Sequence, residues 1–301
     1  MIDFSVFPRR NKTYDGTGGG KLSIDYNGEL YMLKFPNAAS NGRKRSGSNG
    51  CISEHLGSRI FESVGIRAQK TLLGVYSTGE KNRIVVACED FTRHCTVFQS
   101  FASLKNTVVD QVQSGTVTEL SSIISSIDAQ QAMDPEILKR FFWDMFIVDA
   151  LIANRDRHNG NWGFIYNTRT DELDLAPVFD CAGCLFPQSD EELMGEVLSE
   201  QPELDARIYN IPTSAITQNG SRINYYNFIT SLSDSGCCAA LKRIVPLIDM
   251  DRINAIIDAV PIIGDIQKDF YKTILAERKA RILDKALSLL RSKERTGKLW
   301  L

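Results

Sequence analysis

Residues 134–184 read DPEILKRFFWDMFIVDALIANRDRHNGNWGFIYNTRTDELDLAPVFDCAGC, and the rest of the chain is organised around this stretch. Asp134 is a good N-cap and Pro135 a good first helical residue, so we predict a helix that begins there. Apolar side chains between residues 137 and 152 cover most of its circumference, which is typical of a helix inside a large core. A polar loop at residues 154–161 follows abruptly. The stretch therefore predicts a buried helix with a polar loop at its C-terminal end.

After this loop the pattern changes to that of a β-hairpin. The two predicted strands are Trp162–Tyr166 and Glu172–Leu175, separated by a turn at residues 167–171. The second strand leads through Pro177 into Asp180. We therefore expect the polar residues on both sides of the hairpin to lie on loops that the buried helix and the hairpin hold in place.

Three polar side chains on these loops have the order and spacing that phosphoryl transfer needs. A carboxylate near an acceptor hydroxyl takes its proton, and an asparagine five positions later offers a neutral oxygen to magnesium. A second carboxylate, after a strand, binds magnesium that bridges the nucleotide phosphates. Asp156, Asn161 and Asp180 match these roles in that order. The alternative is that Asp156 and Asn161 only brace a turn, since Asp and Asn are common there.

The composition is that of an ordinary globular protein, with 43% hydrophobic and 24% charged residues. A chain of 301 residues can form one large domain or two lobes. Its formal net charge of −2 provides no general attraction to nucleic acid or to an anionic membrane. We therefore expect no direct nucleic-acid partner.

The N-terminus, MIDFSVFPRRNK, lacks the basic segment and apolar core of a classical signal peptide, and no apolar run is long enough to span a membrane. Folding in the cytoplasm is therefore expected, and export without a leader is the alternative. Seven cysteines, an odd number scattered through the chain, indicate free thiols rather than a disulfide framework.

A glycine-rich turn near the N-terminus, DGTGGGK at residues 15–21, precedes a predicted hairpin. Asn27 and Gly28 are typical of a type I′ turn between strands at residues 22–26 and 29–35. Glycine lets backbone N–H groups approach phosphates closely. The predicted nucleotide contacts are Gly16, Gly18, Gly19 and Gly20. The spacing matches neither a Walker loop nor G-x-G-x-x-G, and a plain flexible loop is the alternative.

Lys34 lies on an apolar face of the returning strand, where a buried ammonium is costly unless an anion accompanies it. A kinase supplies such anions, namely the nucleotide phosphates and a glutamate from the following helix. That helix is predicted from Cys51 to Val64, with Gly65 as its C-cap, and it carries Glu54 near its start. We therefore predict that Glu54 pairs with Lys34. The alternative is a solvated first-turn acid favoured by the helix dipole.

Two further strands, Thr71–Tyr76 and Arg83–Cys88, complete a small predicted sheet. Glu89 and Phe91 follow it and are the predicted hinge, where an adenine could bond exposed backbone groups. Beyond the hinge, residues 92–133 read as polar helical connections. Further helices are predicted at Cys237–Ile248, Met250–Val260 and Gly264–Arg291.

A basic segment rich in glycine and serine, AASNGRKRSGSNG at residues 38–50, separates the lysine strand from the following helix. Its glycines let the backbone reach the mouth of a kinase cleft, and the cations at residues 43–45 would attract a phosphate. Ser46 and Ser48 are therefore predicted as autophosphorylation sites. A simple surface loop is the alternative, since exposed serines are common in loops.

Other chemistries have less support in the sequence. The three histidines, at positions 55, 94 and 158, lack the spacing of zinc ligands. Cys181 and Cys184 are the one suggestive thiol pair, but no second pair of Cys or His lies at zinc-ribbon distance. We therefore do not expect cysteine-based metal or redox chemistry.

The motifs taken together resemble those of the HipA-like serine/threonine kinases, in a short branch of that family. The resemblance rests on Asn154-x-Asp156-Arg-His-x-x-Asn161 and on Ala176-Pro177-x-Phe-Asp180. It extends to YNGELYMLKFP for the lysine strand, NGCISEHLGSRI for the helix with Glu54 and VVACEDFT for the hinge, and so covers nearly the whole chain.

This resemblance implies an α+β, bilobal, protein-kinase-like fold with a small β-rich N-lobe, residues 1–91, and a larger, mainly helical C-lobe, residues 92–301. It also implies ATP and magnesium as cofactors and protein substrates that bear serine or threonine. No extra subdomain precedes the glycine-rich turn, so antitoxin pairing and operator binding are not expected, and an antitoxin or host partner is left open. Cys181-Ala182 follows Asp180 where eukaryotic kinases have Phe-Gly, so their activation-loop switching is not expected either.

Two other functional classes are weighed against a protein kinase. A phosphoinositide-type lipid kinase shares the D-R-H-x-x-N loop and a later Asp, but this chain lacks an obvious basic-aromatic segment that would face a membrane. A catalytically weak binding or toxin module would keep the fold without turnover. The chain has all five polar positions of an active kinase, which argues against a catalytically weak module. These positions are Lys34, Glu54, Asp156, Asn161 and Asp180.

Overall fold

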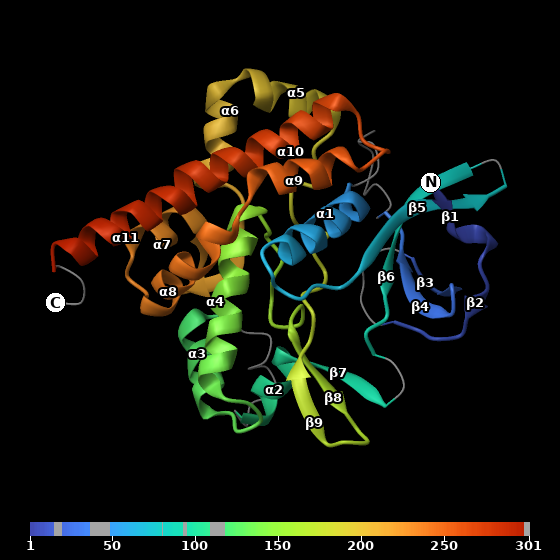
Figure 1. Ribbon diagram of the computed structural model, residues 1–301, viewed down its shortest axis with the longest axis horizontal. Helices are drawn as coiled ribbons and strands as arrows, with labels where there is room; N and C mark the ends of the chain where they lie inside the picture. The colour runs from blue at the N-terminus through green and yellow to red at the C-terminus, as the bar shows by residue number, and fades with distance from the viewer. Residues whose placement is uncertain (15–19, 37–48, 80, 93–94, 109–117, 298–301) are drawn as a thin grey trace.

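The computed structural model describes residues 1–14, 20–36, 49–79, 81–92, 95–108 and 118–297. A β-rich part and a larger helical part lie side by side, with helix α1 between them (Figure 1). The α+β, bilobal kinase-like fold expected from the sequence is confirmed by this architecture together with the structural matches given below. Five of the predicted site residues lie outside the described residues: Gly16, Gly18, Gly19, Ser46 and Ser48.

The β-rich part is one six-stranded sheet with the strand order β1-β5-β6-β4-β3-β2. All neighbouring strands are antiparallel except β1 and β5. Asn27 and Gly28 connect β3 to β4 with φ angles of 56° and 82°, the positive values that the predicted type I′ turn requires. The strands are β1 (Ile2–Asp3), β2 (Arg9–Arg10), β3 (Lys21–Tyr26), β4 (Glu29–Lys34), β5 (Thr71–Thr78) and β6 (Lys81–Glu89).

Helix α1 (Gly50–Ser63) joins the two parts of the molecule. It packs against β5 and β6 on one side and against α9 (Met250–Asp258) on the other. Leu56, Ile60 and Phe61 are fully buried in the large core of the helical part, whereas the sheet has its own smaller core around Phe4, Leu33 and Val85. The apolar stripe of α1 therefore belongs to the core of the helices. The lobe boundary at residue 91 stays a prediction.

The predicted central helix is α4 (Pro135–Leu151), in which most of the apolar side chains are buried. The side chain of Asp134 accepts a hydrogen bond from Glu136 N at 2.9 Å, so it caps the helix as predicted. The predicted hairpin after it forms β8 (Gly163–Asn167) and β9 (Glu172–Leu175).

One prediction for residues 92–133 is wrong, because part of this segment is a strand. Strand β7 (Thr96–Ser100) pairs antiparallel with β8 and makes the hairpin a three-stranded sheet. Two helices follow it, α2 (Phe101–Val108) and α3 (Leu120–Ala129). The five residues of β7 alternate between half-buried and exposed, so only the pairing with β8 distinguishes them from a polar connection.

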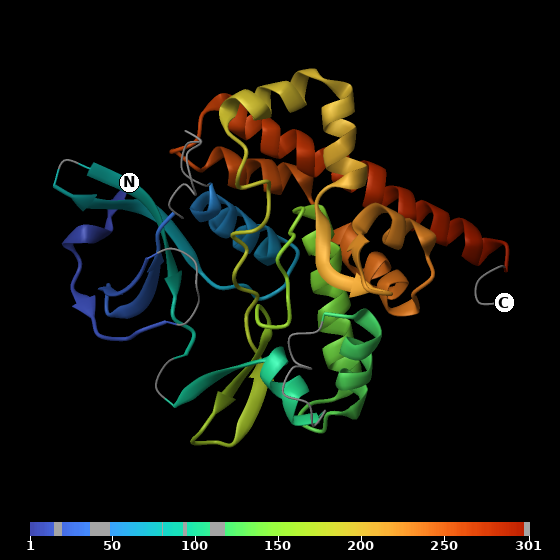
Figure 2. The same ribbon diagram turned by 180° about the vertical axis from the view of Figure 1, so that it is seen from behind.

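The C-terminal third is helical apart from a short β10–β11 hairpin (Figure 2). The long helix predicted at Gly264–Arg291 is present as one continuous helical run, in which the π-helical residues Lys279–Asp284 connect α10 (Asp265–Arg278) to α11 (Lys285–Arg295). No helix among the described residues is long and apolar enough to cross a membrane. The remaining elements are α5 (Glu191–Ser199), α6 (Gln201–Asp205), the π-helical turn Ala206–Asn210, β10 (Thr213–Gln218), β11 (Ser221–Asn224), α7 (Tyr225–Ser231), α8 (Ser235–Ile244) and α9 (Met250–Asp258).

Candidate active site

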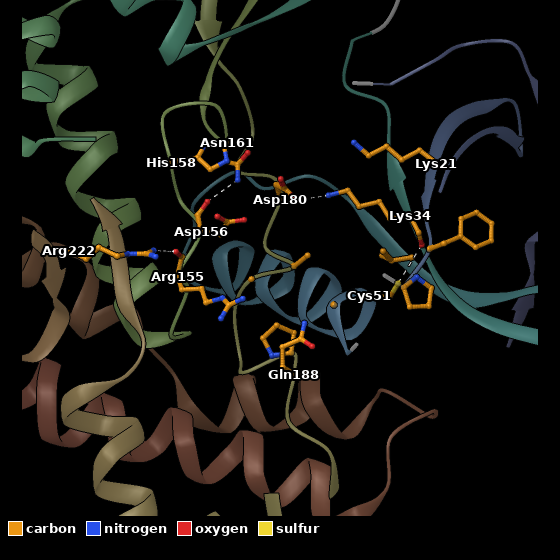
Figure 3. A pocket seen from close by; sticks show the side chains of 17 residues that line it. Lys21, Lys34, Cys51, Arg155, Asp156, His158, Asn161, Asp180, Gln188 and Arg222 are labelled. Atoms are coloured by element: carbon orange, nitrogen blue, oxygen red, sulfur yellow. Dashed lines mark hydrogen bonds and ion pairs between the residues drawn. The ribbon is translucent and has the colours of Figure 1, made fainter. Parts of the chain in front are cut away.

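A cavity of about 750 Å³ lies between the sheet and the helical part. Side chains from β3, β4, α1, β11 and the loops before β8 and after β9 line it (Figure 3). Four of the predicted site residues share this cavity: Lys34, Asp156, Asn161 and Asp180. Lys34 and Asp180, which are 146 positions apart in the sequence, therefore meet here.

Lys34, at the end of β4, lies between two carboxylates. Its Nζ is 3.1 Å from Glu54 Oε2 and 2.9 Å from Asp180 Oδ1. Burial lowers the pKa of Lys34, but the two carboxylates outweigh burial, so the pKa lies well above its usual value and the ammonium keeps its charge. Lys34 is thus a largely buried cation held by one acid from α1 and one from the loop after β9.

Glu54 is completely buried, so it is not the solvated first-turn acid that the sequence left as an alternative. Neither of its carboxylate oxygens has a hydrogen-bond partner among the described residues, because the 3.1 Å contact with Lys34 does not have hydrogen-bond geometry. A buried carboxylate of this kind is stable only beside a cation. Glu54 therefore depends on Lys34.

Asp180 follows β9 and has the left-handed backbone conformation, with φ of 56°. Such a conformation is costly for a residue other than glycine and is often found at functional sites. Burial raises the pKa of Asp180, but the ammonium of Lys34 outweighs this and holds the pKa below its usual value. The carboxylate is therefore ionised and directed at the cavity (Figure 3).

Asp156 and Asn161 lie on one tight loop between α4 and β8. Asn161 Nδ2 donates to the main-chain oxygen of Asp156 at 2.9 Å, which leaves the amide oxygen of Asn161 as the ligand atom of this side chain. Asp156 is exposed at the cavity, and its N–H donates to Asn154 Oδ1 at 3.1 Å. The loop thus presents one carboxylate and one amide oxygen to the same space.

A buried ion pair that the sequence does not single out holds this loop. Arg157 Nε donates to Asp149 Oδ2 at 3.0 Å, and both side chains are almost completely buried. Arg157 also donates to the carbonyl oxygen of Asn161, one candidate ligand, and to that of Phe179, the residue before Asp180, the other candidate ligand. Burial opposes the charge of Arg157, but Asp149 outweighs it and raises the pKa of the guanidinium. The one signal in the sequence is an acid, Asp149, inside an otherwise apolar helix segment.

Two glycines let the surrounding elements approach closely. A Cβ at Gly57 of α1 would lie 2.6 Å from Cys181 Cβ and 3.0 Å from Cys184 Sγ. A Cβ at Gly183 would lie 2.9 Å from Asp156 Cβ. The thiols of Cys181 and Cys184 are buried and free, and burial raises the pKa of both. The described residues contain no group of three His, Cys, Asp or Glu side chains that could hold a metal ion.

The predicted hinge residues do not line the cavity that the described residues form. The N–H of Glu89 donates to the Lys70 carbonyl and its own carbonyl accepts from Gln69 Nε2, both at 2.8 Å. Phe91 packs against the ring of Phe179, with the ring centroids 5.6 Å apart. The adenine contacts assigned to Glu89 and Phe91, and the phosphate contact assigned to Gly20, stay predictions.

The family model of the HipA-like C-terminal domain matches residues 17–223, more than half of the chain. The chain belongs to the HipA-like family. The family assignment made from the sequence, including the serine/threonine kinase class, is confirmed by this match and by the relatives described next.

Two comparisons show how far the HipA-like likeness extends. The chain is 47% identical to the serine/threonine-protein kinase CtkA of Helicobacter pylori (strain J99) over 95% of its own length and 87% of that protein. The crystal structure of the H. pylori proinflammatory kinase CtkA superposes with a TM-score of 0.91 at 45% identity, covering 97% of this chain and 98% of that chain.

A more distant HipA-like structure shares the fold alone. The complex of the Shewanella oneidensis MR-1 toxin–antitoxin system HipA, HipB and its operator DNA matches with a TM-score of 0.57 at 14% identity. The match covers 94% of this chain and 69% of that chain. The short-branch character expected from the sequence agrees with the much greater similarity to CtkA.

Proposed function

We propose that this chain transfers the γ-phosphoryl group of ATP, in the presence of magnesium, to serine or threonine hydroxyls of protein substrates. The observation that carries the proposal is the meeting of Lys34, Asp156, Asn161 and Asp180 around one cavity of about 750 Å³. A bound nucleotide with part of an acceptor chain needs a space of this order. When bound, ATP supplies the phosphoryl group and magnesium neutralises its charge.

The chemistry of the side chains fits these two cofactors. The amide oxygen of Asn161 and the carboxylate of Asp180 are hard oxygen ligands, and two protein ligands of this type suit a magnesium ion that also takes phosphate oxygens. Lys34 carries the charge that binds a phosphate, and Glu54 orients its ammonium from the other side. The glycines of residues 16–20 would bring backbone N–H groups to the phosphates.

Asp156 is the proposed general base. It is exposed at the cavity, so an acceptor hydroxyl can reach its carboxylate, while its main chain is held by Asn154 and Asn161. The carboxylate accepts the hydroxyl proton as the oxygen attacks, and Arg157 keeps the loops of Asn161 and Asp180 in register through their neighbouring carbonyl oxygens. The proposed base and the amide ligand are therefore held on one loop, and Arg157 fixes that loop against the loop that carries Asp180.

The test is a transfer assay with γ-labelled ATP, with and without magnesium. We expect label in serine or threonine peptides, and loss of labelling when EDTA removes the metal. Label found only in phosphoinositide vesicles offered in parallel would favour the lipid-kinase class. Nucleotide binding without transfer to either acceptor would favour a binding module and contradict the proposal.

Autophosphorylation is a second part of the proposal, and it rests on the sequence alone. Ser46 and Ser48 follow three cations in a segment between the lysine strand and α1, which begins beside the cavity at Gly50 and Cys51. Mass spectrometry after incubation with ATP and magnesium tests it. Phosphate found only at other residues of active enzyme would remove Ser46 and Ser48 and leave the transfer activity standing.

A further inference from the structure

A second cavity of about 380 Å³ opens beside the candidate active site. The two cavities are adjacent, because they have lining residues in common: Arg155, Gly183, Pro187, Gln188 and Arg222. The loop after Asp180 forms one wall and the β10–β11 region forms the other. A chain whose hydroxyl reaches Asp156 therefore has this cavity directly next to it.

Three arginines and no acidic residue line the second cavity. Arg155 immediately precedes Asp156, and Figure 3 shows its side chain extending toward Gln188 rather than toward the catalytic loop. Arg222 donates to the carbonyl oxygens of Ser214 and Arg155, which carry no net charge. In the described part of the chain neither Arg155 nor Arg222 forms an ion pair with a carboxylate, so no acidic side chain offsets the charge of either guanidinium.

The third arginine is already neutralised in part. Arg207, from the π-helical turn, forms an ion pair with Glu203, and its side chain is only 12% exposed. Arg207 therefore forms a largely buried part of the cavity wall. Its contribution to the positive potential of the cavity is weaker than that of Arg155 and Arg222. The positive potential of the cavity is concentrated at Arg155 and Arg222, on the side nearest Asp156.

The rest of the lining is uncharged and includes an apolar group, made up of Phe186, Pro187, Leu193, Ile211 and Pro212, beside the polar Gln188, Ser189 and Thr213. Ile211 is 46% exposed, so apolar surface stands open beside the arginines. An apolar wall lowers the local dielectric and strengthens the attraction between a guanidinium and an anion. The cavity thus combines an apolar surface with an unneutralised cationic edge.

We propose that this cavity binds the part of a protein substrate that flanks the acceptor hydroxyl and selects an aspartate or glutamate there. The proposal rests on the kinase function proposed above and adds the class of substrate. Guanidinium groups bind carboxylates through paired, charge-assisted hydrogen bonds, and Arg155 and Arg222 provide these donors next to the base. A basic flanking residue would meet like charge and be rejected.

Peptide kinetics test this selection. Three serine peptides of one length differ only beside the serine, where they carry glutamate, glutamine or lysine. A charge-assisted contact at a partly exposed site predicts that kcat/KM for the glutamate peptide exceeds that for the glutamine peptide about tenfold, with the lysine peptide lowest. Higher salt should reduce the preference, since the contact is partly solvated.

Charge reversal identifies the residue responsible. Arg155→Glu should remove the preference for glutamate and favour the lysine peptide, and Arg169→Glu serves as the matched control. Arg169 lies on the exposed turn of the β8–β9 hairpin, away from both cavities. Fluorescence titration of labelled peptides, without ATP, gives the same comparison for binding alone, and urea unfolding reports whether Arg155→Glu is folded.

The outcomes separate the two proposals. Equal kcat/KM for all three peptides with active wild-type enzyme would overturn the selection and leave the kinase function intact. An unchanged preference in a folded Arg155→Glu variant would overturn it as well, as would a peptide bound only when it carries phosphoserine. Failure of wild-type enzyme to label any peptide would overturn the proposed function and this inference with it.

Discussion

At the scale of single residues, Asp156 is the proposed general base, and we expect it to contribute little to nucleotide binding. Asp156→Asn should lower the rate of phosphate transfer about 10²- to 10⁴-fold, because it removes the proton acceptor. Nucleotide affinity should stay near the wild-type value, since Lys34, Asn161 and Asp180 remain. Transfer assays and nucleotide titration measure the two effects. The control is Asp174→Asn on β9, where the side chain is 65% exposed. Near wild-type turnover in Asp156→Asn would contradict the role of Asp156 as general base.

Lys34 and Glu54 form a single unit, because Glu54 has no exposure and Lys34 lies 3.1 Å from it. Lys34→Met and Glu54→Gln should each lower kcat/KM strongly, and the double variant should lose less than the sum of the two losses. Lys34→Met should also destabilise the fold by about 3 kcal/mol, since it leaves a buried charge unpaired. Urea unfolding separates the two effects. If the loss in the double variant equals the sum of the two single losses in kcat/KM, Lys34 and Glu54 do not act as one unit.

At the scale of elements, helix α1 packs through Gly57 against the loop that carries Asp180. Gly57→Ala gains about 1 kcal/mol of helix propensity, but its Cβ meets Cys181 Cβ at 2.6 Å in a buried contact. Overpacking of this kind costs about 1–3 kcal/mol, so we expect a net loss of stability. Gly195→Ala on α5 is the control, because nothing lies within 4 Å of the added Cβ. Equal effects of the two changes in urea unfolding would show that the close approach carries no energy.

The same helix makes the fold sensitive to acid. His55 on α1 is largely buried and contacts Thr71 Oγ1 at 2.9 Å, and burial, with a contribution from Arg59, lowers its pKa to about 4. The unfolded chain binds a proton near pH 6.5, so the folded state loses stability as the pH falls from 6.5 toward 4. At pH 5 this loss is about 2 kcal/mol relative to neutral pH.

His55→Asn keeps a polar group beside Thr71 without a proton that titrates in this range. Its stability should therefore depend less on pH between 7 and 5 than that of the wild-type protein. Urea unfolding at the two pH values measures the difference. A wild-type stability that falls no more steeply than that of the variant would show that His55 is not the responsible group.

At the scale of the whole molecule, the sheet and the helical part are linked across the cavity by Lys34 and Asp180. A nucleotide with magnesium that contacts both sides should raise the midpoint of thermal unfolding, since a ligand at 100 times its Kd stabilises the fold by about 2.7 kcal/mol. Asp180→Asn should retain a metal-independent shift and lose the part that magnesium adds. Differential scanning fluorimetry with ATP, with and without magnesium, measures both. A magnesium increment preserved in Asp180→Asn would remove its ligand role.

Local patterns in the sequence were enough to predict many elements of this protein. Asp134 and Pro135 mark the start of α4, Asn27-Gly28 marks the β3–β4 turn, and the run of apolar residues predicts a buried helix, because capping, turn geometry and periodicity depend on neighbouring residues. The order of Asp156, Asn161 and Asp180 indicated the chemistry for the same reason, since each motif lies within a short loop.

What the sequence alone determined is therefore many of the elements, the family and the set of polar residues. Only the tertiary structure decided the rest: that β7 joins the β8–β9 hairpin, that Asp149 and Arg157 hold the catalytic loops, and that Arg155 and Arg222 line a second cavity. These features depend on pairs that lie 8 to 71 positions apart in the chain, such as Arg157 with Asp149 and Arg222 with Arg155. A buried ion pair or a shared cavity exists only once packing brings such residues together, and neither periodicity nor local spacing carries that information.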